Sequence, residues 1–579
     1  MVSEKLFLRI RSAAARSFVG VLVSVVFCGT CFLSGCPEKR VETQRAPASE
    51  GPNGPDRVHK DISGFEESRK EPREDLRLVV LIVADQLPSW FFEKNLSMFR
   101  HGIRRLLDAG VYYPEAVFPH AATFTAVGHA TLATGARPSV SGILSNRWYH
   151  RDIKAVRSSV FDSDHKLFTL NPKEPVMAPG VSPSMLRVKT VGDMLKKHTE
   201  NRGKVVAVSL KDRAAVLTGG KKADLAIWYS NQVDPPIMTT SAYYRNVPPE
   251  WLRVLNERFD MKGKLSRVWR PLASETEGAG KDGIEERQNA FEHSPFRSGN
   301  PAREIRNFPA GDRLVFKTAL AAIDGEKLGK DDIPDFLAVS FSTPDYVGHK
   351  WGQESPEMRD IMMRLDVKIG RFLEELDRKV GKGSYAVVFT SDHGAPPSRV
   401  KGKRIVRVPP QTIAAAAAKG ATDTAGKGRW IEAVANPYVT LTAEAMDLPE
   451  DKRNDLITGV MDSLRRVEGI GYVRRTDEIS GNCDDRECVD HAFCLIVPGD
   501  APGEIVFGVE PYYYIANYDY DIINHGSHHM YDRVVPLVVY EPGRPSGKVE
   551  KQVSVFSIAS TLTRLLGVPS PPRAEAPPL

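Results

Sequence analysis

Residues 118–149 read FPHAATFTAVGHATLATGARPSVSGILSNRWY. The small and apolar residues from Ala126 to Thr134, followed by Gly135, predict a short helix that ends at the glycine. Thr125 opens this helix, where a threonine hydroxyl commonly caps a free backbone N–H. The same position suits a nucleophile, because the positive end of a helix stabilises an alkoxide or a bound phosphate. Taken alone, the stretch leaves both interpretations of Thr125 open and favours the cap.

Apolar runs elsewhere in the chain predict the strands of a buried parallel sheet. They are LRLVVLIVAD (76–85), KVVAVSL (204–210), DFLAVSF (335–341), YAVVFTS (385–391) and RVVPLVVY (533–540). Helical patterns lie between them, notably in residues 356–381, where apolar side chains recur at helical spacing. Strands that alternate with helices predict an α/β fold, with a mostly parallel central sheet covered by helices on both faces.

Three segments interrupt the alternation. Residues 222–310 carry several Trp and Tyr side chains among polar stretches rich in Gly and Pro, and we expect them to form a cap. Residues 396–435 include the helix-prone run QTIAAAAAKG and predict a lid element. Residues 436–515 predict a small α+β insertion. The expected catalytic domain, which contains the cap and the insertion, spans residues 76–570.

The N-terminus has the layout of an export signal. Basic residues precede an apolar run over residues 18–32, and LSGC follows at residues 33–36. LSGC resembles the bacterial lipobox, which implies that residues 1–35 are a lipoprotein signal peptide and that the Cys36 thiol carries lipid. An uncleaved signal anchor and an ordinary signal peptide remain alternatives, although the apolar run is short for a membrane span.

Residues 36–75 are rich in Pro, Gly and charged side chains, and predict a disordered tether. The expected location is the periplasmic side of a bacterial envelope, and the outer membrane is favoured because Pro37, not aspartate, follows the cysteine. The net charge of +6 is small for 579 residues and includes the basic leader. We see no basic block that indicates a nucleic-acid partner.

Three cysteines remain beyond the leader and Cys36: Cys483, Cys488 and Cys494. In an oxidising compartment one disulfide is expected, and Cys483 with Cys488 is our first choice. The pairing does not follow from the sequence alone. A zinc site is disfavoured, because the cysteines lack paired C-x-x-C spacing.

Acidic and histidine side chains gather where the predicted strands end: Asp85, Asp345, His349, Asp392, His393 and, before the last strand, His525. Ligands of open α/β sheets bind beyond the carboxyl ends of the strands, so these residues are expected to converge. Singly, each aspartate also fits a turn former and each histidine a hydrogen-bonded structural residue. Together, mixed oxygen and imidazole groups suit zinc or a similar divalent ion.

The ordered motifs make the chain recognisable. They are VADQ (83–86), TAVGHATLATG (125–135), GILSNRWY (142–149), SLKDRAAVL (209–217), TPDYVGHKWG (343–352), TSDHGA (390–395) and a late His-Gly-Ser. From about residue 76 to 570 the chain resembles the alkaline phosphatase superfamily, specifically the phosphate-irrepressible periplasmic alkaline phosphatases that use a threonine nucleophile. These enzymes are related to the nucleotide pyrophosphatase/phosphodiesterases.

The resemblance implies two divalent metal ions, expected to be zinc. One would be held by Asp345, His349 and His525, and the other by Asp85, Asp392 and His393 together with Thr125. Thr125 would be the nucleophile and form a covalent phosphothreonine. Residues near these motifs remain rivals: His528 and His529 for the place of His525, and Thr123 for that of Thr125.

The same resemblance assigns Lys211, Arg213 and Asn146 to the phosphoryl oxygens of the substrate. Lys211 and Arg213 alternate where a predicted strand ends, so we expect them to face one way; pairing with surface acids is the alternative. Extra cations favour a doubly charged phosphate monoester. The expected function is therefore an exported phosphomonoesterase acting on small phosphate esters, attached to a membrane only through Cys36. The alternatives are a nucleotide pyrophosphatase/phosphodiesterase and a non-catalytic lipoprotein that binds phosphorylated ligands. The sequence does not determine the oligomeric state.

Overall fold

The computed structural model describes residues 75–170, 179–233, 235–259, 267–272, 291–295, 301–481, 483, 489–518 and 521–579. The expected signal peptide, Cys36 and nearly all of the expected tether lie outside these residues. Contacts divide the chain into residues 1–54 and 55–579, and the description concerns the second unit. Among the described helices, none combines the length and the apolar character that crossing a bilayer requires.

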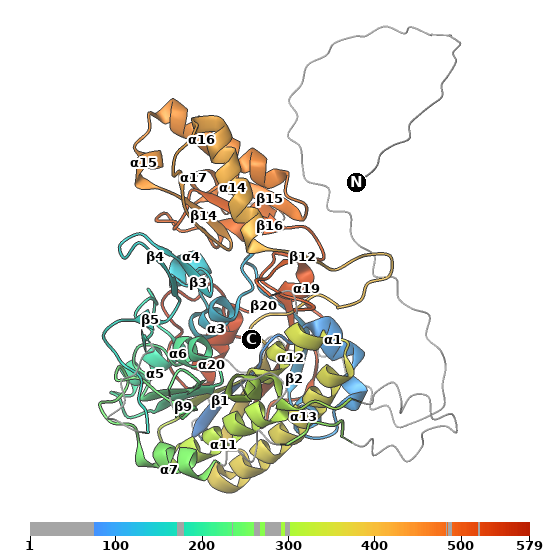
Figure 1. Ribbon diagram of the computed structural model, residues 1–579. Helices are drawn as coiled ribbons and strands as arrows, with labels where there is room; N and C mark the ends of the chain where they lie inside the picture. Colours follow the sequence, from blue (N-terminus) through green and yellow to red (C-terminus); the bar gives the residue numbers. More distant parts are fainter. Residues whose placement is uncertain are drawn as a thin grey trace, which may run out of the picture. The chain divides into compact units, whose positions relative to one another are not determined.

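A ten-stranded sheet forms the centre of the described residues, with β20 (Val553–Ser554) paired to β2 beside the main order (Figure 1). That order is β19 (Gly547–Lys548), β2 (Val111–Val117), β18 (Val534–Tyr540), β11 (Tyr385–Thr390), β1 (Leu78–Ala84), β10 (Asp335–Phe341), β7 (Val205–Ser209), β8 (Leu225–Ser230) and β9 (Ile237–Thr239). The five consecutive strands β11, β1, β10, β7 and β8 run parallel to one another, whereas β9 runs antiparallel to β8. The predicted α/β class with a mostly parallel sheet is confirmed.

The strand β18 departs from the parallel pattern that its sequence predicts. It runs antiparallel to both β11 and β2. A continuous apolar run reports burial on both faces of a sheet and not the direction of the chain, so RVVPLVVY has the same composition in either orientation. At the opposite side of the sheet, β8 and β9 come from the segment expected as a cap.

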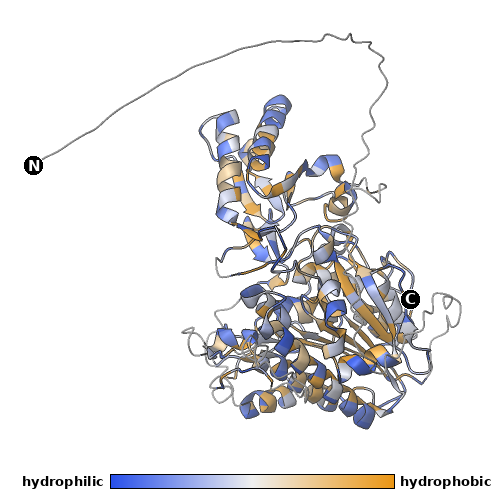
Figure 2. Cartoon of the chain, turned by 90° about the vertical axis from the view of Figure 1, so that its right-hand side faces the viewer, coloured by the Kyte–Doolittle hydropathy of each residue, from blue (hydrophilic) through white to orange (hydrophobic). Residues whose placement is uncertain are grey.

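Alternate side chains of the central strand β1 point into two different cores. Val79, Leu81 and Val83 pack into one, with helices α3 (Thr125–Thr134), α5 (Val191–His198), α6 (Asp212–Gly219) and α20 (Ser557–Leu565). Leu78, Val80 and Ile82 pack into the other, with helices α1 (Ser89–Lys94), α2 (Gly102–Ala109), α7 (Glu250–Arg258), α11 (Pro309–Gly325), α12 (Thr343–Trp351) and α13 (Pro356–Leu376). The orange, apolar strands in Figure 2 lie among helices whose outer faces are blue, as expected of a sheet that helices cover on both faces.

A third core belongs to a smaller α+β unit. Its antiparallel sheet has the order β13 (Ile431–Ala435), β14 (Tyr438–Leu441), β16 (Ile505–Val509) and β15 (Ile470–Arg475). Helices α14 (Pro410–Ala425) and α16 (Glu450–Arg465) pack on this sheet. The helix-prone run QTIAAAAAKG lies in α14 and therefore shares a core with this unit. Two further short strands, β12 (Val406–Val408) and β17 (Tyr513–Ile515), form a separate parallel pair.

Short elements complete the described chain. They are η1 (Leu96–Met98), α4 (Pro138–Ser141), β3 (Arg147–His150), β4 (Ala155–Ser158), β5 (Phe161–Asp162), β6 (Gly180–Val181), α10 (Pro301–Glu304), η3 (Ile305–Asn307), η4 (Asp377–Gly381), α15 (Ala443–Met446), α17 (Thr476–Ile479), α18 (Val489–Cys494) and α19 (Met530–Arg533).

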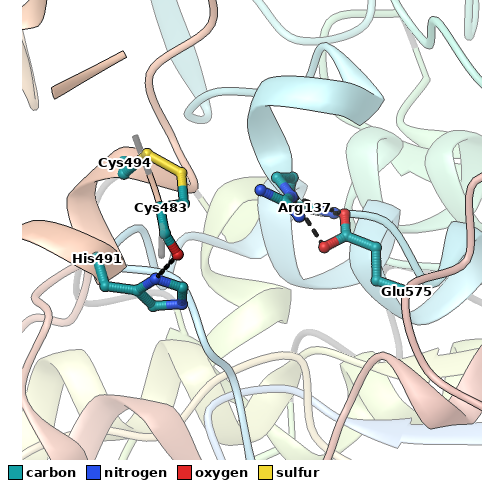
Figure 3. Close-up of a disulfide and its surroundings, with 5 residues drawn as sticks. All are labelled: Arg137, Cys483, His491, Cys494 and Glu575. Carbon is teal, nitrogen blue, oxygen red and sulfur yellow. Dashed lines mark hydrogen bonds and ion pairs between the residues drawn. A yellow bond between two sulfur atoms is a disulfide. The ribbon is translucent and has the colours of Figure 1, made fainter. Parts of the chain in front are cut away.

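The disulfide joins Cys483 to Cys494, and the expected pairing of Cys483 with Cys488 is wrong (Figure 3). Helix α18 ends at Cys494 and brings its Cα within 5.6 Å of the Cα of Cys483, inside the range that a disulfide spans. Nδ1 of His491, on the same helix, lies 2.5 Å from the carbonyl oxygen of Cys483. The position of Cys494 at the end of helix α18 brings it to Cys483, and the spacing of cysteines along the sequence does not report this position.

The C-terminal tail fixes the end of helix α3. The carboxylate of Glu575 accepts hydrogen bonds from the backbone N–H and the Nε of Arg137 (Figure 3). The backbone N–H of Glu575 donates to the carbonyl of Gly135, which ends α3 with φ +66°. The C-terminal end of the helix that carries Thr125 is thus held by a residue distant in sequence.

Candidate active site

Three neighbouring strands deliver the acidic groups to one edge of the sheet. Asp85 follows β1 directly, and its backbone N–H still bonds to the carbonyl of Phe341 at the end of β10. Asp345 lies in the first turn of α12, which begins two residues after β10. Asp392 follows β11 by two residues. Because these strands are parallel and adjacent, their carboxyl ends meet, as the crevice rule predicts.

The first group consists of Asp345, His349 and His525. Asp345 and His349 are one turn apart on α12, and Oδ1 of Asp345 lies 3.2 Å from Nε2 of His349. His525 comes from the loop before α19, and its Nε2 lies 3.4 Å from the same oxygen. All three residues that the sequence assigned to one metal ion therefore meet.

The second group consists of Asp85, Asp392 and His393. Nε2 of His393 lies 3.6 Å from Oδ1 of Asp85 and 3.4 Å from Oδ2 of Asp392. The two groups adjoin, since the rings of His393 and His525 stack with centroids 3.6 Å apart. Ligand atoms of Asp345 also lie within 4.8 Å of those of Asp85 and His393. Asp345 thus stands between the two groups, which its assignment to one group did not anticipate.

The orientation of the histidines suits a metal ion. Nδ1 of His349 donates to the carbonyl of Ile523 (2.9 Å), and Nδ1 of His525 donates to that of Thr123 (2.7 Å). Nδ1 of His393 lies 3.0 Å from the carbonyl of Gly394. A carbonyl only accepts, so each Nδ1 carries the hydrogen, and the lone pair of each neutral ring is on Nε2.

The distances and the unpartnered atoms fit bound cations. Zinc–nitrogen bonds of about 2.0–2.1 Å place the ligand atoms of a tetrahedral ion about 3.3 Å apart. The Asp–His separations in both groups are of this size. Buried atoms without a hydrogen-bond partner among the described residues include Oδ1 of Asp85, Oδ1 of Asp345, Oδ2 of Asp392 and Nε2 of His393. Leaving such atoms unpaired is costly, and a divalent ion in each group would satisfy them.

Burial and neighbouring charges shift the pKa values of the site's acidic and histidine side chains in different directions. Burial and the neighbouring Asp392 raise the pKa of Asp85 well above its ordinary value. Burial also opposes ionisation of Asp345, but Lys211 and His349 outweigh it and hold the pKa of Asp345 well below its ordinary value. Burial lowers the pKa of His393 to about 3, so this ring is neutral and its Nε2 can bind a metal.

Thr125 is the first residue of α3 and is buried. Phe124 occupies the capping position, and no side-chain hydrogen bond caps the helix, so the interpretation of Thr125 as a cap is wrong. Oδ1 of Asn146 instead accepts the hydrogen bond of the Ala126 N–H (2.9 Å). This contact leaves the amide Nδ2 of Asn146 as a donor and the Thr125 hydroxyl available for chemistry.

Helix α3 approaches the second group through a glycine. A Cβ on Gly128 would lie 2.0 Å from the carbonyl oxygen of Asp392, so only glycine allows this contact. One residue later, Nδ1 of His129 bonds to the carbonyl of Thr125 (2.8 Å) and Nε2 to the Ser340 hydroxyl (2.9 Å). The same Nδ1 lies 3.2 Å from Oδ2 of Asp392. Sequence analysis gave His129 no role, although its position four residues after Thr125 on one helix face was a usable signal.

Lys211 lies at the centre of the site. Its Nζ is 3.2 Å from Oγ1 of Thr125, 2.6 Å from Oδ2 of Asp345 and 2.7 Å from Oδ2 of Asp85. These partners are buried, so the expected alternative, pairing with surface acids, does not hold for Lys211. Arg213 follows in the first turn of α6 and not on an extended strand. Its closest carboxylate among the described residues, that of Asp212, is 3.8 Å away, so its guanidinium keeps donors for another anion.

The rival residues have other partners. Nε2 of His529 bonds to the carbonyl of Val509 (2.9 Å), and the ring of His528 lies against Phe493, with centroids 5.3 Å apart. The hydroxyl of Thr123 donates to the carbonyl of Ser527 (2.8 Å). Among the described residues, none of the three joins either Asp/His group.

A mostly parallel sheet whose strand ends bring Asp and His side chains beside a helix that begins with threonine is the arrangement of the alkaline phosphatase superfamily. The chain belongs to the type I phosphodiesterase / nucleotide pyrophosphatase family, whose model matches residues 79–530. The family and the fold identify the chain as a phosphatase-type enzyme of this superfamily.

Known proteins are similar over most of the chain. A protein named calcium-transporting ATPase from Myroides odoratus is 27% identical over 524 residues, which are 86% of this chain and 93% of that protein. The alkaline phosphatase PafA of Elizabethkingia meningoseptica is 28% identical over 536 residues, covering 89% and 96%. The crystal structure of wild-type PafA aligns with a TM-score of 0.76 at 27% identity, covering 88% of this chain and 99% of that one. Alkaline phosphatase relatives imply divalent metal ions. The sets of described residues that lie close enough together to hold one are Asp345, His349 and His525, and Asp85, Asp345 and His393.

Proposed function

We propose that the protein hydrolyses phosphate monoesters with Thr125 as its nucleophile. The observation that carries the proposal is the position of the Lys211 ammonium, in contact with the Thr125 hydroxyl and with a carboxylate of each Asp/His group. A phosphate bound beside Thr125 would therefore meet a nucleophile, a fixed cation and the edges of both groups at once. The name of the relative PafA, an alkaline phosphatase, supports the same reaction.

Two divalent ions, for which zinc fits the mixed carboxylate and imidazole donors, would be held by Asp345, His349 and His525 and by Asp85, Asp392 and His393. When bound, they supply Lewis-acid stabilisation of the charge on the attacking and leaving oxygens.

The protein's own residues supply the rest. The Thr125 hydroxyl gives its proton to solvent and Oγ1 attacks phosphorus. The bond to the leaving oxygen breaks, that oxygen takes a proton from solvent, and the phosphoryl group is held on Thr125 until water releases it as phosphate and restores the hydroxyl. The N-terminal end of α3 favours negative charge at this point. Lys211, Arg213 and the Nδ2 of Asn146 donate to the phosphoryl oxygens that do not react. His129 fixes the first turn of α3 by its bond to the Thr125 carbonyl.

The cations support a monoester as substrate. A monoester dianion exposes three free phosphoryl oxygens, whereas a diester has one charge and a second substituent. Lys211 is buried, and among the described residues the carboxylate nearest to the Arg213 guanidinium, that of Asp212, is 3.8 Å away. Since Coulomb energy scales with the product of the charges, both residues stabilise the dianion more.

The second candidate is a nucleotide pyrophosphatase/phosphodiesterase, which the description of the matching family favours. Turnover of 4-nitrophenyl phosphate and of bis(4-nitrophenyl) phosphate separates the two candidates. We expect a higher kcat/KM for the monoester, and loss of turnover of both in Thr125→Ala. A preference for the diester by orders of magnitude would reject the monoesterase. Turnover that survives in Thr125→Ala would reject this nucleophile, and an inactive, metal-free protein would support the non-catalytic lipoprotein.

We also propose that the protein is exported and anchored through lipid on Cys36. The support is the sequence LSGC after an apolar run. Labelling of cells with radioactive palmitate should mark the wild-type protein and not Cys36→Ala. Equal labelling of the two, or recovery of the wild type in the cytosolic fraction, would contradict the proposal.

A further inference from the structure

The segment that follows the TSDHGA motif is strongly basic. Between residues 394 and 422 the sequence has no Asp or Glu, and its Lys and Arg residues are Arg399, Lys401, Lys403, Arg404, Arg407 and Lys419. The first four belong to the loop between Asp392–His393 and β12. The site itself does not use this charge, because its phosphate cations are Lys211 and Arg213.

The loop surrounds an open hollow of about 560 Å³. Arg399, Lys401, Lys403 and Arg404 line it together with Ile522. Its volume lies in the range of about 300–1,000 Å³ that is typical of sites for small ligands. The four cationic side chains are exposed.

The cations of the hollow have few partners of opposite charge. Within the described part of the chain, no carboxylate forms an ion pair with the side chains of these four residues. Glu354 is the nearby acid, and its Oε2 accepts from the backbone N–H of Arg399 (3.1 Å), while its Oε1 lies 3.6 Å from Nζ of Lys94. Lys403 lies over the ring of Tyr512, at 4.7 Å from the centroid, which directs its ammonium without neutralising it. The hollow therefore carries a local positive potential.

The hollow adjoins the first Asp/His group. Ile522, on its wall, donates its backbone N–H to the carbonyl of His349 (2.7 Å), and the next residue accepts the Nδ1–H of His349 (2.9 Å). Ser398, also at the hollow, packs against Gly352 at the end of α12. One layer of residues thus separates the hollow from His349.

The geometry of phosphoryl transfer relates the hollow to the leaving group of the substrate. Attacking and leaving oxygens are in line in phosphoryl transfer. Helix α3, which begins with Thr125, contacts Asp392 of the second group through Gly128 and His129. An attacking oxygen at that group would place the leaving oxygen opposite it, toward the group of Asp345, His349 and His525, which the hollow adjoins through Ile522.

We propose that the hollow is an accessory anion subsite, which binds a second anionic group carried by the leaving alcohol of the phosphate ester. The inference rests on the proposed function and specifies its substrate class: small phosphate esters with a further phosphate or carboxylate several bonds away from the reacting one. Exposed Lys and Arg side chains give such contacts modest strength and sensitivity to salt.

The test compares the monophosphate and the bisphosphate of 1,4-butanediol and of 1,6-hexanediol as substrates of the metal-loaded enzyme. In the variant Lys401→Ala/Lys403→Ala/Arg404→Ala, we expect the ratio of kcat/KM for bisphosphate over monophosphate to fall about tenfold, mainly through KM, and less in 0.5 M salt. The statistical factor of two reacting ends is the same in both enzymes and cancels. Turnover of 4-nitrophenyl phosphate, whose leaving group has no second anion, should stay within about twofold.

The control variant Lys197→Ala/Lys452→Ala/Arg466→Ala removes the same charge from exposed residues of α5, of α16 and of the C-cap of α16, none of which lines the hollow. An unchanged ratio in the loop variant, an equal loss for mono- and bisphosphate, or the same fall in the control would overturn the subsite. If the loop variant keeps the ratio but no longer binds vesicles of anionic phospholipid, the subsite is also overturned, and the loop is instead a membrane contact.

The subsite and the proposed function fail in distinguishable ways. A wild-type enzyme that does not hydrolyse 4-nitrophenyl phosphate refutes the function. The subsite is then judged by calorimetric titration of Thr125→Ala with butanediol bisphosphate, where the loop substitutions should weaken binding about tenfold. Binding that the loop substitutions leave unchanged refutes the subsite.

Discussion

Replacing Lys211 with alanine removes the cation at the centre of the site. Its Nζ contacts Oγ1 of Thr125 at 3.2 Å and carboxylate oxygens of Asp345 and Asp85 at 2.6 and 2.7 Å. The substitution thus deletes a donor to the phosphoryl oxygens, and it increases the negative charge of a buried site.

The structure gives the size of the effect. Loss of one fixed donor to a developing charge lowers kcat by about 10²–10³, or about 3–4 kcal/mol. Coulomb energy scales with the product of the charges, so a singly charged diester should lose about half of this free energy, or about tenfold to thirtyfold in rate. The preference for monoester over diester should therefore fall by about tenfold or more.

The assay is kcat/KM for 4-nitrophenyl phosphate and its bis(4-nitrophenyl) diester in the metal-loaded enzyme. Lys196→Ala is the matched control, because Lys196 is also buried and pairs with Asp224 (2.9 Å), but lies outside the site. The control should lose thermal stability without a change in substrate preference. Equal losses for both substrates in Lys211→Ala would refute the reasoning and make Lys211 a structural counter-ion of the carboxylates.

Three further predictions concern the support of the site. Gly128→Ala places a methyl group 2.0 Å from the Asp392 carbonyl oxygen, so it should lower the free energy of unfolding by about 1–3 kcal/mol and remove most of the activity. In the control Gly499→Ala the methyl group meets open space, and neither quantity should change. Denaturant unfolding measures the stability of the two variants, and turnover of 4-nitrophenyl phosphate measures their activity. Burial raises the pKa of Asp532 to about 8, from about 3.9 in the unfolded chain. The folded protein therefore binds more protons between these values, and this contribution to stability is full below about pH 4 and is lost as the pH rises to about 8. Asp532→Asn should flatten the fall in melting temperature over this range, and an unchanged pH profile would contradict the shift. A strong chelator should lower the melting temperature of the wild type and of Thr125→Ala alike. The reason is that a ligand present at about 1,000 times its Kd adds about 4 kcal/mol to the free energy of unfolding. Zinc added back is the control, and a melting temperature that chelation leaves unchanged would argue against metal in the Asp/His groups.

Local sequence patterns predict the elements that carry the site. The apolar runs that form β1, β10 and β11 are each followed within a few residues by an acidic side chain, and a parallel sheet collects such ends at one edge. The spacing of Asp345 and His349 corresponds to one helical turn, so their approach follows from local geometry.

Other features depend on contacts between distant residues. Asn146, twenty positions beyond Ala126, accepts the hydrogen bond expected of the Thr125 side chain, and this exchange changes the interpretation of Thr125. The position of Asp345 between both groups depends on how α12 lies against the end of β1. The antiparallel direction of β18 and the pairing of Cys483 with Cys494 also depend on distant contacts. Apolar composition does not encode the direction of a strand, and cysteine spacing does not encode which cysteines meet in space.

The sequence by itself determined the α/β class, the superfamily and the candidate residues, because these follow from hydrophobic periodicity and from motifs of a few adjacent residues. The tertiary structure alone decided which side chains share a space: the Lys211 ammonium between the carboxylates of Asp85 and Asp345, the close approach of Gly128 to Asp392, and the basic loop beside His349. Such contacts join residues up to several hundred positions apart, and their distances follow from the packing of whole strands and helices, which no local pattern records.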